Sequence, residues 1–204
     1  MDKTSDTYRT LSKPSEEILF KEKKSKFYGW AYPIQSEDEV KPIIEKIKKK
    51  YPAAGHVCYA LQLGVDQIYY RANDDGEPNN SAGKPIYGQI QAFDVTNVLV
   101  VVARIFGGTK LGVGGLISAY RTGAQMALQA SKIQKRYLND TYQISFGYPE
   151  MDKVMRIIKQ RNYTISVRIL EVDCQLLVVV RKSESKRLIA FFKALHKVSV
   201  VKID

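Results

Sequence analysis

Apolar residues along this chain follow strand spacing in some segments and helical spacing in others, which predicts mixed α and β structure. The strand candidates in the first half are residues 17–34, which hold two strands around a Lys-rich turn, 56–64, 67–74 and 97–106. A short turn with Gly64 joins 56–64 to 67–74 and predicts a hairpin. The run of valines in 97–106 predicts a strand buried on both faces.

Helical spacing appears in three segments before residue 139, namely 36–51, 83–94 and 116–138. Ser36, with Glu39 three residues later, predicts a capping box at the first of these helices. Ser81 stands where the N-cap of the second helix is expected. The third segment is the longest helix candidate in the chain.

After Asp140 the pattern becomes regular and follows the order β-α-β-β-α-β. The six segments are residues 141–148, 149–161, 163–171, 174–181, 183–196 and 198–203. This order within a short stretch is typical of the ferredoxin-like fold. We therefore predict an α+β protein of two domains, residues 1–138 and 139–204.

The net positive charge of the chain indicates which kinds of partner it can bind. Lys and Arg number 32 against 21 Asp and Glu, a net charge of +11, and the excess is spread along the chain without a basic tail. Such a charge favours binding to nucleic acid or another anionic surface. No apolar run approaches the roughly 18 residues of a membrane span, and the first residues lack a signal-peptide core. We expect a cytoplasmic protein with no membrane partner.

Zinc ligands are too few for a zinc site. His56 and Cys58 lie two residues apart on one strand face, but His196 and Cys174 are the only other histidine and cysteine. Zinc sites use three or four such ligands. We therefore interpret Cys58 as a small buried residue of a strand.

The acidic segment DDGEPNNSAGKP, residues 74–85, admits two interpretations. Asp74, Asp75 and Glu77 offer oxygen ligands for a hard cation, but the spacing of a calcium-binding EF-hand is absent. Adjacent acids at a strand end point to opposite sides, which disfavours a shared metal. We favour a tight turn at Asp75 and Gly76, and we expect neither a metal nor a cofactor.

The Gly-rich segment FGGTKLGVGGL, residues 106–116, joins the valine-rich strand to the longest helix. A loop of this kind can hold an anion at the helix N-terminus, where Lys110 would add a charge-assisted contact. The glycines can equally serve close packing. The spacing matches neither a Walker A loop nor G-x-G-x-x-G, and no G-x-S-x-G nucleophile motif appears.

Several segments together carry a family resemblance. They are SKF at 25–27, AGHVCYA at 54–60, DDGEPNNSAGKPI at 74–86 and VVARIFGGTKLGVGGLISAY at 101–120. In this order and spacing they resemble the YigZ/IMPACT family, and residues 140–204 resemble the C-terminal domain of its bacterial two-domain members. The resemblance implies a first domain like the second domain of ribosomal small-subunit protein five, and a ferredoxin-like second domain similar to one in elongation factor G. Eukaryotic members are associated with translational regulation, and the family implies no catalytic residues.

The chain departs from the family pattern at three positions. Asn80 and Ser81 stand where the family usually has Gly-Thr, and Asn is the residue after Gly that best tolerates a left-handed conformation. These changes indicate that the geometry of the turn, rather than its charge, is required. Ser118 replaces a residue that is often basic, which argues against a strongly basic groove beside the Gly-rich segment.

We therefore hypothesise a translation-associated regulatory protein without enzymatic activity, which binds RNA, the ribosome or a translation factor rather than DNA. The expected binding surface consists of Asp74, Asp75, Glu77, Ser81, Arg104, Gly107, Gly108, Lys110, Gly112 and Arg121. The alternative is a phosphate- or nucleotide-binding enzyme that uses the same two loops, which requires the loops to lie close together. A third possibility is a protein-interaction module, which would show an exposed apolar patch on the ferredoxin-like sheet.

Overall fold

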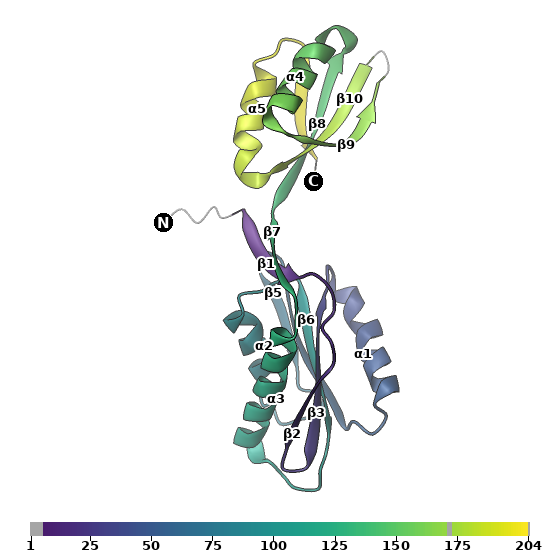
Figure 1. Cartoon of the computed structure of the whole chain (residues 1–204), viewed down its shortest axis with the longest axis vertical. Helices are drawn as coiled ribbons and strands as arrows, with labels where there is room; N and C mark the ends of the chain where they lie inside the picture. The colour runs from purple at the N-terminus through teal and green to yellow at the C-terminus, as the bar shows by residue number, and fades with distance from the viewer. Residues whose placement is uncertain (1–5, 171–172, 204) are drawn as a thin grey trace. The chain divides into compact units, whose positions relative to one another are not determined.

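A computed structural model of the chain describes residues 6–170 and 173–203 (Figure 1). Contacts divide these residues into two compact units: Tyr8–Arg136, and residues 137–203 together with Asp6 and Thr7. The division at 138 and 139 into two domains stays a prediction. Among the described residues, no helix combines the length and the apolar character needed to cross a membrane.

The unit Tyr8–Arg136 is built on a five-stranded antiparallel sheet. Across the sheet the strands are β2 (Ile18–Glu22), β3 (Ser25–Pro33), β6 (Val98–Ile105), β4 (His56–Leu63) and β5 (Tyr69–Asn73). The helices are α1 (Val40–Lys50), preceded by a 3-10 turn at Glu37–Glu39, α2 (Gly83–Ala92) and α3 (Gly112–Gln129). Figure 1 shows α2 and α3 on one face of the sheet and α1 on the other.

The central position of β6 in the sheet explains why its sequence is almost continuously apolar. Successive side chains of a strand point to opposite faces, and both faces are covered by helices here. Val98, Val100 and Val102 pack under α2 and α3, whereas Leu99 and Val101 pack under α1. The prediction of a strand buried on both faces is confirmed, and the 56–64 and 67–74 hairpin is formed by β4 and β5.

The predicted helix 116–138 is wrong at its C-terminal end. Helix α3 stops at Gln129, and Ile133–Tyr137 forms strand β7, which pairs with β1 (Thr7–Leu11) in a separate two-stranded sheet. The Ser131 hydroxyl donates a hydrogen bond to the Ala127 carbonyl at the helix end. The pairing partner lies more than a hundred residues earlier in the chain, so local spacing could not reveal it.

The second unit has the predicted element order β-α-β-β-α-β. Its elements are β8 (Asn139–Gly147), α4 (Met151–Arg161), β9 (Thr164–Ile169), β10 (Asp173–Arg181), α5 (Ser185–Lys193) and β11 (Val198–Ile203), with 3-10 turns at Tyr148–Glu150 and Lys182–Glu184. The antiparallel sheet has the order β11-β8-β10-β9, and its apolar core lies on the face that α4 and α5 cover. At the start of β8, Asp140 accepts hydrogen bonds from the Ser185 hydroxyl at 2.5 Å and from Lys202 at 2.9 Å.

Candidate functional site

Asp74 directly follows strand β5 and caps helix α2 with its side chain. One carboxylate oxygen accepts hydrogen bonds from the backbone N–H groups of Ala82 and Gly83 at 2.9 and 2.8 Å, and the other accepts from Asn80 N–H at 2.8 Å. Carboxylates stabilise helix N-termini because they satisfy unpaired N–H groups and complement the helix dipole. The predicted cap Ser81 is wrong, since its hydroxyl donates instead to the Pro78 carbonyl at 2.6 Å.

Asp75 points to the opposite side and ties the turn to strand β4. Its carboxylate accepts from Val57 N–H at 2.7 Å and pairs with Lys48 at 3.2 Å, while its carbonyl accepts from Nδ1 of His56 at 2.8 Å. Asn80 has a φ of +63°, so it takes the left-handed conformation for which Asn is suited. The two aspartates therefore hold the shape of the turn and are both occupied by bonds within the protein.

Glu77 turns inward and forms a buried ion pair with Arg104 of β6 at 2.8 Å. Only 4% of the Glu77 side chain and 8% of the Arg104 side chain are exposed. The Tyr120 hydroxyl of α3 donates to the same Glu77 oxygen at 2.7 Å. Buried charges are tolerated only where they are paired and hydrogen-bonded. Glu77, Arg104 and Tyr120 therefore connect the acidic turn, the central strand β6 and helix α3.

Cys58 lies beside this trio and is fully buried. Its thiol donates a hydrogen bond to the Asp74 carbonyl at 3.0 Å. Burial raises the pKa of the Cys58 thiol, and the nearby negative charges of Glu77, Asp75 and Asp74 add to the shift. A hydrogen bond with Tyr120 opposes it. A thiol that stays protonated is a poor nucleophile, so Cys58 acts as a core residue.

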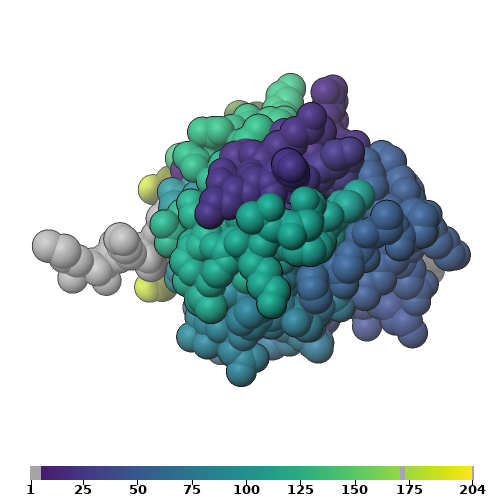
Figure 2. Space-filling view, turned by 90° about the horizontal axis from the view of Figure 1, so that it is seen from below, coloured from purple at the N-terminus to yellow at the C-terminus, as the bar shows by residue number. Residues whose placement is uncertain are grey.

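The Gly-rich segment follows β6 and leads into α3. A β-carbon on Gly107 would lie 2.0 Å from the backbone of Lys24, so Gly107 allows the loop to pass the β2–β3 turn. Gly108 and Gly112 have φ values of +87° and +72°, which favour glycine. Lys110 is exposed and makes no ion pair with any described residue. In Figure 2 this teal-green segment lies on the surface next to the purple β2–β3 turn.

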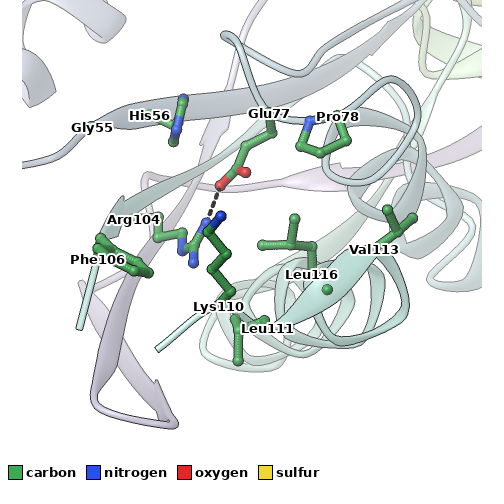
Figure 3. A pocket seen from close by; sticks show the side chains of 11 residues that line it. Gly55, His56, Glu77, Pro78, Arg104, Phe106, Lys110, Leu111, Val113 and Leu116 are labelled. Carbon is green, nitrogen blue, oxygen red and sulfur yellow. Dashed lines mark hydrogen bonds and ion pairs between the residues drawn. The ribbon is translucent and has the colours of Figure 1, made fainter. Parts of the chain in front are cut away.

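The acidic turn and the Gly-rich segment meet in a cleft of about 520 Å³ (Figure 3). We call it the loop cleft. The residues that line it are Gly55, His56, Glu77, Pro78, Arg104, Phe106, Lys110, Leu111, Gly112, Val113 and Leu116. Glu77 and Arg104 provide the polar part, and Phe106, Leu111, Val113 and Leu116 provide an apolar wall. Among the described residues, no group of three His, Cys, Asp or Glu side chains is arranged to hold a metal.

Residues 23–128 match the model of the Impact N-terminal domain, which covers just over half of the chain. The chain belongs to the IMPACT family. It is similar to the IMPACT family member YvyE of Bacillus subtilis, with 31% identity over 78% of this chain and 73% of that protein. It is also similar to the IMPACT family member YigZ of Escherichia coli, with 29% identity over 84% of this chain and 83% of that one.

A solved structure supports the fold of this IMPACT family member. It is a crystal structure of a hypothetical protein, with a TM-score of 0.68, 24% identity and coverage of 98% of both chains. At this level of identity the similarity shows the fold alone.

The structure divides the expected binding surface of this IMPACT family member into two groups. The residues that line the loop cleft are Glu77, Arg104, Lys110 and Gly112. The residues outside its lining are Asp74, Asp75, Ser81, Gly107, Gly108 and Arg121. Ser81 is fully buried, so it has no exposed surface for binding.

His56 and Phe106 line the loop cleft, although the sequence motifs did not predict them as site residues. His56 and Phe27 flank Arg104 on the neighbouring strands, because the register places both opposite Arg104. Phe106 directly follows β6 and keeps 54% of its surface exposed. An aromatic residue beside a Gly-rich loop was the only local signal for it.

Proposed function

We propose that this protein is a translation-associated regulatory protein that binds RNA through the loop cleft. Membership of the IMPACT family supports the association with translation, as the resemblance to eukaryotic members implied. The net charge of +11 supports a polyanionic partner. The observation that carries the proposal is the loop cleft itself, which places exposed Lys110 and Phe106 beside buried Arg104.

The chemistry of the loop cleft suits a nucleic acid. Lys110 pairs with no carboxylate in the part of the chain that the structure describes, so it can pair with a phosphate. Release of condensed counterions from the nucleic acid then drives binding. The Arg104 guanidinium lies 5.4 Å from the Phe106 ring centroid, which orients the ring at the cleft. Aromatic side chains beside cations are the usual platform for unpaired bases.

Filter binding of single-stranded ribosomal RNA fragments across a range of salt concentrations tests the proposal. We expect binding that weakens steeply with salt, and a Lys110→Glu variant that binds less tightly with a shallower salt slope. Lys49→Glu in α1 is the matched control, since it makes the same charge change on an exposed residue outside the loop cleft. Absence of binding at low salt would refute the proposal.

We also propose the finer fold relationships and the location that the family implies. The order β11-β8-β10-β9, with both helices on one face, supports a ferredoxin-like second domain similar to one in elongation factor G. The first domain would resemble the second domain of ribosomal small-subunit protein five. Superposition of each unit on those two proteins would test the relationships, and cell fractionation would test the cytoplasmic location.

A second candidate function is contact with an apolar surface of a ribosomal protein or translation factor. The face of the β8–β11 sheet that lies opposite α4 and α5 exposes Val167 (44%), Ile169 (44%), Val201 (58%) and Ile203 (36%). Apolar residues grouped on one open sheet face often mark an interaction surface. Co-sedimentation with ribosomes that resists high salt, and that Val201→Glu abolishes while Lys110→Glu does not, would support this function.

A further inference from the structure

We propose that the loop cleft receives one unpaired nucleotide of an RNA strand, with its phosphate at the N-terminus of α3 and its base against Phe106. This inference rests on the RNA-binding function proposed above, and it specifies the partner as single-stranded.

The N-terminus of α3 offers unused hydrogen-bond donors to an anion. Among the described residues no side chain caps this helix of 18 residues, and its first turn holds no acidic residue. Gly112 and Val113, at its start, line the loop cleft. The first N–H groups of a helix have no partner within the helix, and the helix dipole favours negative charge there.

A second and independent donor points to the same ligand. The Nε atom of Arg104 is buried and has no hydrogen-bond partner among the described residues, although the side chain is 92% buried and lines the loop cleft. Glu77 occupies the Nη1 end of the guanidinium. A buried donor without a partner is unfavourable. The Nε atom is closed to solvent, so the guanidinium must turn slightly toward the loop cleft for a phosphate oxygen to accept from it, and that bond would relieve the unpaired donor. Lys110 on the wall adds a positive charge for the phosphate.

The apolar wall of the loop cleft suits the flat face of a base. Phe106 and Val113 each keep 54% of their surface exposed, and both belong to the lining with buried Leu111 and Leu116. An inorganic phosphate or a simple polyanion would leave this wall in contact with water. A base stacked on Phe106 would cover it, and every base has a face that can stack.

The size of the loop cleft favours a single unpaired unit. Its volume of about 520 Å³ lies in the range of small-molecule sites and is suited to one nucleotide. In an A-form duplex the bases are stacked inside the helix and cannot enter such a cleft. The loop cleft should therefore distinguish a single strand from a duplex of the same sequence.

Competition experiments with the whole protein test this inference. The probe is a fluorescent single-stranded oligonucleotide, and the competitors are its unlabelled form, its duplex, inorganic polyphosphate and adenosine monophosphate. We expect the unlabelled single strand to compete about 5- to 150-fold better than the duplex and polyphosphate, because stacking contributes about 1–3 kcal/mol per base. Phe106→Ala should remove most of this preference, whereas Ile68→Ala, an exposed apolar residue outside the loop cleft, should not.

Two further variants test the phosphate contact. Lys110→Gln should lower the salt slope by about 0.7, the value for one lost phosphate contact with a single strand. Arg104→Lys keeps a cation for Glu77 and removes the Nε donor, so it should weaken binding of the oligonucleotide; a urea titration shows whether this variant is folded. If Arg104→Lys is unfolded, the Phe106 and Lys110 variants still decide the result.

The outcomes separate this inference from the proposed function. Failure of every nucleic acid to bind at low salt overturns both. Binding in which duplex, single strand and polyphosphate compete equally, or in which Phe106→Ala changes nothing, overturns only the single-nucleotide inference. Competition by adenosine monophosphate equal to that of the strand would also overturn it, and would assign the loop cleft to free nucleotides.

Discussion

Replacement of Asp74 by Ala tests whether the acidic turn stabilises the fold or binds a ligand. Asp74→Ala removes the acceptor of three backbone N–H groups, from Asn80, Ala82 and Gly83. Gly83 also packs closely against the end of β5, since a β-carbon there would lie 2.6 Å from the backbone nitrogen of Asn73. The start of α2 therefore depends on the Asp74 carboxylate.

The magnitude follows from the number and kind of these bonds. A hydrogen bond to a charged group contributes about 1.5–3 kcal/mol, and loss of a helix cap costs about 0.5–2 kcal/mol. Asp74 is only partly buried, so water can replace some of what is lost. We expect Asp74→Ala to lower the free energy of unfolding by about 3 kcal/mol, and Asp74→Asn, which keeps one carbonyl oxygen, by about 1 kcal/mol.

Urea denaturation followed by circular dichroism measures both variants. Glu45→Gln in α1 is the matched control, because it removes one exposed carboxylate and should change stability by less than about 0.5 kcal/mol. RNA binding of Asp74→Asn should stay close to that of the wild type. A variant Asp74→Ala that is as stable as the control but binds RNA poorly would show that Asp74 contacts a ligand instead.

Three other predictions follow from local geometry. Gly88→Ala should stabilise the protein by about 0.5–1 kcal/mol in urea denaturation, because a β-carbon at this position of α2 would meet no atom within 4 Å. Gly107→Ala should destabilise it, because a β-carbon there would lie 2.0 Å from the backbone of Lys24. Cys58 should resist iodoacetamide until the protein is unfolded, as mass spectrometry of the labelled peptide would show, because burial raises the pKa of its thiol. Burial raises the pKa of Asp140, but the hydrogen bonds from Ser185 and Lys202 outweigh it, so the pKa lies below its usual value. The ionised Asp140 should therefore stabilise the protein above about pH 4, and this stabilisation should be lost at lower pH. The urea midpoint of Asp140→Asn should consequently fall less on acidification than that of the wild type.

Local patterns predicted most elements of the fold. The spacing of apolar residues located the β4–β5 hairpin, the buried strand β6 and the β-α-β-β-α-β order of the second unit. Side-chain periodicity reflects which face of an element is buried, so it can be read without knowledge of the neighbours. The predicted C-terminal end of the third helix was wrong, because residues 133–137 form strand β7 by pairing with β1. Strand β1 is distant in the sequence and contributes nothing to the local spacing of apolar residues.

The candidate site was only partly predictable. The motifs located the acidic turn and the Gly-rich segment, but not the role of each residue in them. Asp74 and Glu77 are three residues apart, yet one caps a helix and the other pairs with buried Arg104. Which of two acids faces the interior depends on the backbone of the turn and on the strand that passes beneath it.

The sequence by itself determined the family, through motifs that can be compared without knowledge of their contacts. It also determined the order of most elements and the left-handed turn at Asn80, because these depend on residues close together in the chain. Only the tertiary structure decided that Glu77 and Phe106 share one cleft. Arg104 reaches Glu77 because β3, β6 and β4 pair in a register that places Arg104 between Phe27 and His56. Register is set by packing across the whole sheet, so no local stretch of sequence contains it.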